Sequence, residues 1–266
     1  MKNFTDKSST ARTMLNKVPE VTLFFWLIKI MATTVGETFA DYLNVTLGFG
    51  LSKTSVVMTF LLLVALVLQF ITRKYVPVAY WLSVVLISVV GTLITDNLTD
   101  NLGLPLQTAT LMFAISLAAV FAVWFISEKT LSIHSITTTR RESFYWLTIL
   151  FTFALGTAAG DLFSETYQLG YGLSALIFGA LIAVVAFARF GMGASEVTTF
   201  WAAYILTRPL GASIGDYMSQ SKEDSGIGLG TTTTSAIFLV LIFLLVGYLA
   251  ITRVDATEKK LAEIES

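Results

Sequence analysis

Four aspartates recur in this chain at the same place in a repeated pattern. In each copy a tryptophan is followed ten residues later by a glycine and, five residues after that, by the aspartate. The four sets are Trp26/Gly36/Asp41, Trp81/Gly91/Asp96, Trp146/Gly156/Asp161 and Trp201/Gly211/Asp216. Each set lies in an apolar stretch long enough to cross a bilayer, where an ionisable group is costly. Four carboxylates kept at one depth of a membrane are expected to bind cations or to share protons.

Three copies carry a second acid four residues from the aspartate, and the fourth has an amide there. The second acids are Glu37 before Asp41, Asp100 after Asp96 and Glu165 after Asp161, and Gln220 follows Asp216. A spacing of four residues puts both groups on one face of a helix. Because an unpaired buried charge costs on the order of several kcal/mol, converging acids need cations, protons or water. Oxygen ligands of this kind suit the hard cations Mn²⁺, Mg²⁺ and Ca²⁺.

The composition argues against other chemistry. The chain has no cysteine, and its single histidine, His134, lies in a polar stretch, so the usual ligands for zinc and copper are missing. No phosphate-binding glycine loop, nucleophile–histidine pair or nucleotide fingerprint occurs, so no enzyme activity and no cofactor are expected. Basic residues are not interleaved with aromatic ones, which argues against nucleic-acid binding.

Two basic residues fall inside the apolar spans. Arg208 lies three residues before Gly211, in the copy without a second acid. We predict an ion pair with Glu37, the acid nearest in depth, and such a pair could gate the path from the cytoplasm. Lys29 lies three residues past Trp26 and is expected to extend its amine to the cytoplasmic interface.

The other repeated residues are interpreted structurally. Gly36, Gly91, Gly156 and Gly211 are predicted to let helices pack closely, with a hinge or local unwinding as the alternative. Trp26, Trp81, Trp146 and Trp201 are predicted to anchor the helices at the membrane interface. The acids themselves could instead face water at the helix ends, which applies most to Asp100 and Glu165, or could hold the bundle together by hydrogen bonds.

The elements that position these residues are apolar helices. The chain is 55% hydrophobic and 13% charged, with a mean hydropathy of +0.76, which is typical of a polytopic membrane protein. Eight spans are predicted, at roughly 21–42, 49–71, 77–98, 104–127, 143–164, 171–190, 196–218 and 229–252. A short glycine-bearing turn follows each aspartate, so the repeat unit is predicted to be a two-helix hairpin.

The predicted fold is therefore all-α, with eight transmembrane helices in four parallel hairpin repeats. Repeats of two crossings all have the same orientation, so the four aspartates face one side. The predicted parts are an N-terminal tail 1–20, repeats 21–72, 76–132, 138–190 and 193–252, and a C-terminal tail 253–266. Whether the repeats form a ring or two pairs is left open.

Charge predicts the orientation. Thirteen of the seventeen lysines and arginines lie in the tails and the loops between repeats, which places both termini in the cytoplasm. The basic N-terminal segment is expected to be a retained tail and not a signal peptide. With about 1.5 Å of rise per residue, each aspartate lies roughly 22 Å beyond its tryptophan, in the outer half of the bilayer.

Over about residues 21–252, the four tryptophans with their glycines and aspartates resemble a family of bacterial integral membrane proteins. Its members are built of four tandem two-helix repeats, each with a characteristic tryptophan. The resemblance implies the eight-helix fold in the bacterial inner membrane, and it suggests a link with manganese efflux.

We therefore predict a carrier that exports a hard divalent cation, Mn²⁺ first, in exchange for protons. Its predicted metal ligands are Asp41, Asp96, Asp161, Asp216, Glu37, Asp100 and Glu165. Mn²⁺ is the substrate, and the other predicted partners are protons and the lipid bilayer. A passive cation channel, or a membrane scaffold or sensor whose acids stabilise the bundle, are the alternatives. The ion, the direction of transport and the number of chains in a homo-oligomer do not follow from the sequence.

Overall fold

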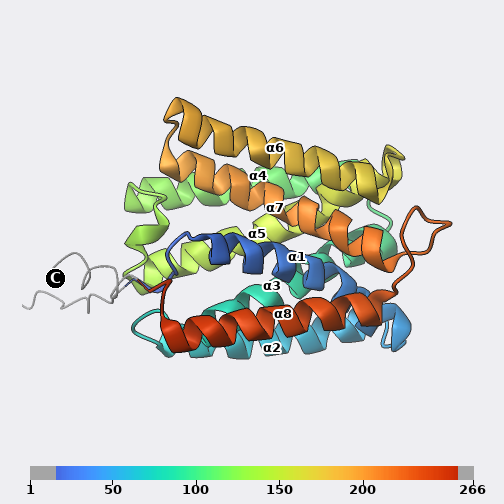
Figure 1. Ribbon diagram of the computed structural model, residues 1–266, viewed down its shortest axis with the longest axis horizontal. Coiled ribbons are helices and arrows are strands. Elements are labelled where there is room, and N and C mark those ends of the chain that lie inside the picture. The colour runs from blue at the N-terminus through green and yellow to red at the C-terminus, as the bar shows by residue number, and fades with distance from the viewer. Residues whose placement is uncertain (1–15, 257–266) are drawn as a thin grey trace, which may run out of the picture.

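The computed structural model describes residues 16–256, so parts of both predicted tails, 1–15 and 257–266, lie outside the described residues. The described residues form eight long α-helices and no strand. The helices are α1 (Leu23–Asp41), α2 (Leu51–Ile71), α3 (Pro77–Asp96), α4 (Leu106–Glu128), α5 (Thr139–Asp161), α6 (Gly170–Met192), α7 (Glu196–Ser219) and α8 (Thr231–Thr252). They lie roughly side by side along the long axis of the molecule (Figure 1).

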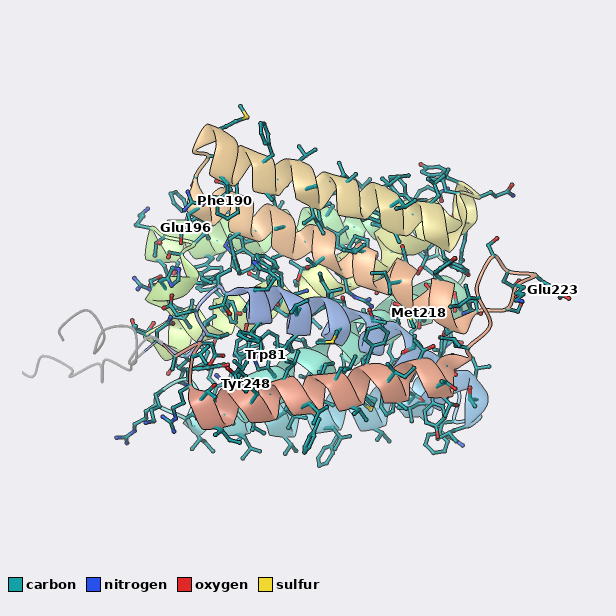
Figure 2. The ribbon with its side chains drawn as sticks, in the orientation of Figure 1. Trp81, Phe190, Glu196, Met218, Glu223 and Tyr248 are labelled. Carbon is teal, nitrogen blue, oxygen red and sulfur yellow. The ribbon has the colours of Figure 1, made fainter. Side chains whose placement is uncertain are left out.

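Four helices form a closed inner ring. α1 packs on α3, α3 on α5, α5 on α7, and α7 packs back on α1. These helices carry the repeated tryptophans, glycines and aspartates, and they run in the same direction. We call the end at which they begin the Trp end and the opposite end the Asp end. In Figure 2, Glu196 marks the Trp end and Glu223 the Asp end.

The even-numbered helices form an outer layer, and their partners differ from the prediction. α2 packs on α3, α4 on α5, α6 on α7, and α8 returns to α1. Each outer helix thus covers the inner helix of the next repeat and not the one that precedes it in its own repeat. The structure does not confirm that the two helices of a repeat pack on each other as a hairpin, because each outer helix packs mainly on the inner helix of the neighbouring repeat.

Seven of the described helices are long and apolar enough to cross a membrane, which indicates a multi-pass membrane protein. The remaining predicted span, which corresponds to α7, carries Glu196, Arg208 and Asp216 and does not reach that apolarity. In the most apolar stretches of α1, α3 and α5, 61–67% of the residues are buried, against 11–28% in the four outer helices. Outer side chains such as Phe190 of α6 project away from the bundle (Figure 2).

Local signals explain where the inner helices begin. The Thr22 side chain accepts a hydrogen bond from Phe25 N, and Thr138 accepts one from Arg141 N, so both threonines cap a helix N-terminus. Pro77 occupies the first turn of α3, where the missing N–H has no partner to lose.

The segments before α1 and after α8 meet at the Trp end. Glu20 N donates to Asp255 O at 2.9 Å. Lys17, which the prediction placed in a tail, is buried, and its Nζ lies 2.6 Å from Glu142 Oε2 at the start of α5. These contacts hold the described ends of the chain against the bundle.

Candidate cation site at the Asp end

The inner ring brings one aspartate from each repeat to the Asp end. α1, α3 and α5 end at Asp41, Asp96 and Asp161, whereas α7 continues past Asp216 to Ser219. Asp216 is buried, and the other three are half-buried. The ring therefore holds four carboxylates together that are far apart in the sequence.

Three acids are close enough to share one ion. Glu37, Asp161 and Asp216 each offer a carboxylate oxygen, and these oxygens all lie within 4.8 Å of one another. Since Ca²⁺-sized ions have ligands at roughly 2.3–2.6 Å, oxygens on opposite sides of one ion are about 5 Å apart. The three residues come from α1, α5 and α7, and we call them the acidic trio.

The remaining predicted ligands surround the trio. Asp41 and Asp96 lie within electrostatic range of Glu37. Asp100 and Glu165 are exposed: the first accepts a hydrogen bond from the neighbouring Thr99 hydroxyl at 2.9 Å, and the second accepts one from Tyr171 Oη at 3.4 Å. These two acids lie at the rim of the cluster, where water reaches them.

One π-helical turn follows the aspartate in each of the first three repeats. The turns are η1 (Tyr42–Thr46), η2 (Asn97–Asn101) and η4 (Leu162–Thr166), and each begins at the residue after the aspartate. π-helical turns are rare, and they occur frequently at functional sites. Their recurrence at equivalent places indicates that the backbone around the acids is specialised in the same way three times.

The fourth repeat has a different turn. Gln220, the residue at the position of the second acid, is extended and lies beyond the end of α7. Gly230 follows Asp216 by fourteen residues, whereas Gly50 follows Asp41 by nine. The longer segment folds back on the helix end, where Ile227 N donates to Tyr217 O at 2.8 Å. The position that carries a second acid in repeats 2 and 3 thus lies in an extended segment in repeat 4 and not in a π-helical turn.

Arg208 crosses the inner ring below the acids. Its Nη2 lies 2.9 Å from Glu37 Oε2, which is the ion pair predicted from the sequence. Nη1 donates to Thr33 O at 3.0 Å, and Nη2 also donates to the hydroxyls of Thr92 and Thr157. The guanidinium, fully buried, therefore connects α7 with α1, α3 and α5 at once.

The two threonines of this network were not predicted from the sequence, although a signal for them was present. Thr92 and Thr157 directly follow Gly91 and Gly156, as Glu37 follows Gly36. Aligning the repeats on their glycines would have placed all three side chains at one level, one helical turn beyond Arg208 and within reach of its long side chain.

The repeated glycines are contact points between neighbouring inner helices. Each faces the residue three positions before the glycine of the next helix in the ring. The pairs are Gly36 with Ser88, Gly91 with Phe153, Gly156 with Arg208 and Gly211 with Thr33. A Cβ atom at any of the four would overlap the facing side chain. The helices continue unbroken through all four glycines, so the geometry agrees with close packing and not with the hinge alternative.

Contrary to the prediction, the tryptophans do not anchor the helices at a membrane interface. They close the Trp end of the bundle. Trp81, Trp146 and Trp201 are buried, and Trp26 is half-buried. Each packs against the aromatic residue before it and against the corresponding aromatic residue of the preceding repeat, with centroids 5.5–6.2 Å apart across repeats. This aromatic girdle consists of Phe25, Trp26, Tyr80, Trp81, Tyr145, Trp146, Phe200 and Trp201.

Lys29 also differs from the prediction. Its side chain is 0% exposed and packs inside the ring between the girdle and Arg208, so its amine does not extend to an interface. The error has the same origin as that for the tryptophans, because both expectations assumed that Trp26 marks the membrane surface.

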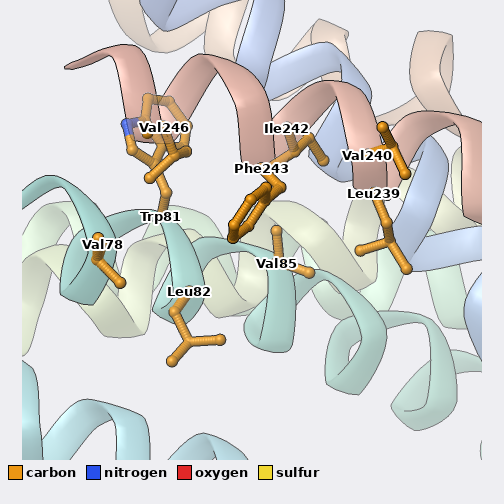
Figure 3. Close-up of a pocket in the computed structure, with 10 residues that line it drawn as sticks. Val78, Trp81, Leu82, Val85, Leu239, Val240, Ile242, Phe243 and Val246 are labelled. Atoms are coloured by element: carbon orange, nitrogen blue, oxygen red, sulfur yellow. The ribbon is translucent and has the colours of Figure 1, made fainter. Parts of the chain in front are cut away.

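A groove of about 470 Å³ lies elsewhere, on the flank of the bundle between α3 and α8. Val78, Leu82, Leu239 and Phe243 are among the apolar residues that line it (Figure 3). It contains no acid and is separate from the cation site.

Comparison with known proteins supports the repeat organisation. A family model described as a Repeat of Unknown Function (DUF347) matches the chain four times, over residues 24–75, 79–130, 144–194 and 199–255. Each match begins two residues before one of the repeated tryptophans and contains the glycine and aspartate that follow it. The matches confirm the four tandem repeats. No curated protein and no solved structure matches the chain.

Proposed function

The chain belongs to the family defined by the DUF347 repeat, and from the acids that its four repeats gather we propose that it is a carrier of a hard divalent cation, Mn²⁺ first. The acidic trio carries this proposal, because its carboxylate oxygens lie within 4.8 Å of one another on three different inner helices. Carboxylate oxygens favour Mn²⁺, Mg²⁺ and Ca²⁺ over softer metals. Choosing Mn²⁺ among them follows the resemblance to proteins linked with manganese efflux.

Arg208 gives the site a means of responding to a cation. Its guanidinium already neutralises Glu37, so an incoming divalent ion competes with Arg208 for that carboxylate. Release of Arg208 from Glu37 weakens the same network that joins α7 to Thr33, Thr92 and Thr157. Cation binding is thereby coupled to the packing of the inner ring, as alternating access requires.

Protons are the proposed counter-ions. The same carboxylates bind either a cation or protons, so a proton gradient can drive the cation in the opposite direction. The distribution of lysines and arginines supports a bacterial plasma membrane orientation with both termini in the cytoplasm and the Asp end outside. In that orientation export releases the cation from the Asp end.

The aromatic girdle favours a carrier over the passive channel. A channel needs a continuous path along the axis in its conducting state. Here the girdle lies across one end of the ring, and the Arg208 network lies across its middle. The scaffold alternative is addressed by the transport experiment.

The experiment uses the full-length protein in liposomes, with uptake of radioactive Mn²⁺ driven by an imposed pH gradient. Asp161→Asn and Asp216→Asn each remove one ligand charge, and we expect each to lower uptake roughly tenfold or more. Glu223→Gln, in the exposed loop after α7, is the matched control and should transport like the parent. Normal transport by both aspartate variants would remove the trio as the substrate site. Currents from single molecules, without counter-transport, would instead identify a channel.

A further inference from the structure

Lys29 is a buried cation that the proposed carboxylate site does not use. Its Nζ has no hydrogen-bond partner, and Lys29 forms no ion pair with another described residue. The amine instead lies 4.1 Å from the ring centroid of Tyr204 and 4.2 Å from that of Phe153. The faces of the two rings stabilise an ammonium, whereas burial favours the neutral amine. No fixed partner therefore commits the side chain to one protonation state.

Packing does not require a lysine at this position. The equivalent residues of the other repeats, seven before the glycine, are Val84, Ile149 and Tyr204, and all are fully buried. An amine without a hydrogen bond is costly in such a place. A functional role explains why a residue that weakens the core is found there.

Lys29 lies in line with the acidic trio. Lys29, Thr33 and Glu37 are spaced four residues apart, so they share one face of α1, and the Cα atoms of Lys29 and Glu37 are about 12 Å apart along the helix axis. Arg208 lies between them, because it donates to both Thr33 O and Glu37 Oε2.

Few other charged or titratable groups face Lys29. α7 contributes Tyr204 and Arg208. Tyr80 of α3 and Tyr145 of α5 lie next to Tyr204 and not next to Lys29. Tyr248 of α8 packs on Phe24 at a centroid distance of 5.6 Å.

Buried phenols extend from Lys29 to the Trp end. The Tyr204 hydroxyl has no partner, and the hydroxyls of Tyr80 and Tyr145 bond to each other. Tyr75 packs against Tyr80 at a centroid distance of 5.8 Å, and its Oη donates to Asp255 Oδ2 at 2.6 Å.

Two features of this series suit proton transfer. In repeats 1 and 4 the residues equivalent to Tyr80 and Tyr145 are Phe25 and Phe200, which have no hydroxyl. The girdle therefore has hydroxyls at these positions only in repeats 2 and 3, which belong to the series. Beyond the helix ends, burial raises the pKa of the Asp255 carboxyl, which favours a bound proton at the outer end of the series.

We infer that Lys29 is a proton-binding site that exchanges with the Trp end through the hydroxyls of Tyr204, Tyr145, Tyr80 and Tyr75. The neutral amine forms an N–H bond with a proton passed along the hydroxyls, each of which gives up one proton and takes another. The Tyr80–Tyr145 step follows a hydrogen bond of the structure, and the other steps need an intervening water. The proton returns to water at the Trp end by the same route when a cation binds the acidic trio, because the two positive charges repel. At about 12 Å and an effective dielectric constant of about 20, each added charge weakens proton binding about tenfold. This coupling rests on the proposed function, whereas proton binding does not.

Proton binding is tested first, without any cation. The full-length protein is labelled with ¹⁵N-lysine in lipid nanodiscs, and the Lys29 amine signal is assigned by its loss in Lys29→Met. We expect the signal to change from ammonium to amine within the pH range in which the protein stays folded. A signal that keeps one protonation state throughout that range overturns the proposal. If Lys29→Met does not fold, Lys29→Arg supplies the assignment.

The route and the coupling are tested with Mn²⁺ in liposomes that contain a pH-sensitive dye. In Lys29→Met and in the double variant Tyr80→Phe/Tyr145→Phe, we expect proton release from the Trp end on Mn²⁺ uptake to fall at least tenfold, while proton release from the carboxylates at the Asp end persists and Mn²⁺/Mn²⁺ exchange stays within about twofold. Tyr248→Phe, which removes a phenol outside the series, is the control. Proton release at the parent rate in the variants overturns the route. If the parent protein neither binds nor exchanges Mn²⁺, the proposed carrier function is wrong. The amine signal then still shows whether Lys29 binds a proton.

Discussion

At the scale of single residues, Arg208 is the main departure from fourfold symmetry. Its equivalents three residues before the other glycines are Thr33, Ser88 and Phe153, and each of the four faces the glycine of the preceding helix in the ring. The other three cannot reach across the ring. One long, charged side chain thus makes contacts with the three inner helices other than its own, which explains why a nearly symmetric bundle needs only one of them.

Removal of Arg208 should destabilise the protein by leaving Glu37 buried without a partner. We expect Arg208→Met to lower the free energy of unfolding by about 3–5 kcal/mol. The double variant Arg208→Met/Glu37→Gln removes both charges, so its free energy of unfolding should fall markedly less. Chemical unfolding of the purified protein in detergent, followed by tryptophan fluorescence, measures both. Equal losses in the single and double variants would mean that the ion pair does not determine the effect.

Asp255 should make stability depend on pH. Burial raises the pKa of its carboxyl in the folded state, although the hydrogen bond from Tyr75 opposes this effect. A raised folded-state pKa gives a stabilisation that is complete below the ordinary aspartate pKa and is lost as the pH rises through the folded-state value. The parent should therefore lose stability over that range relative to Asp255→Asn, which does not titrate there. Unfolding temperatures at a series of pH values test this, and parallel curves for the two proteins would contradict it.

At the scale of helices, the sequence predicted the inner ring better than the outer layer. The inner helices carry the repeated residues, and the predicted spans 21–42, 77–98 and 143–164 end within three residues of the observed helix ends at Asp41, Asp96 and Asp161. The outer helices are apolar on all sides, since they face the inner ring on one side and are largely exposed on the other. Without a polar stripe, nothing in their sequence distinguishes the inner helix of their own repeat from that of the next.

The candidate site was predicted in part for a related reason. Position relative to the repeated glycines made Glu37 the acid nearest in depth to Arg208, and the structure has that pair. Depth alone does not show which acids point inward, so the trio could not be separated from Asp100 and Glu165. The π-helical turns left no signal in residue type.

Close approach of the inner helices gives a prediction with an internal control. Gly91→Ala places a Cβ against Phe153 Cβ, a backbone-proximal atom that cannot swing away. We expect a loss of about 1–3 kcal/mol in the free energy of unfolding, because overpacking forces the helices apart. Gly247→Ala in α8 meets nothing within 4 Å and should be neutral or slightly stabilising. Comparable losses in both variants would show that helix flexibility and not contact determines the cost.

At the scale of the whole molecule, the packing unit is shifted against the sequence repeat. Each compact helix pair joins the outer helix of one repeat to the inner helix of the next, as α2–α3, α4–α5 and α6–α7 do. The fourth such pair, α8 with α1, combines the last and the first of the described helices, and no peptide segment links them directly. The contact between Glu20 and Asp255 brings the two described ends close enough for a short linker.

Two circular permutants distinguish the packing unit from the sequence repeat. Both join the ends of the chain by a flexible linker. The first opens the chain at Gly48, where the turn between α1 and α2 is exposed, and it keeps all four compact pairs covalently linked. The second opens it at Lys74, between α2 and α3, and separates one pair. Since loop closure costs less when the joined elements already pack together, we expect the first to unfold at a temperature close to that of the parent and the second at a clearly lower one. The reverse order would mean that the sequence repeat, and not the pair that packs across repeats, is the unit that folds.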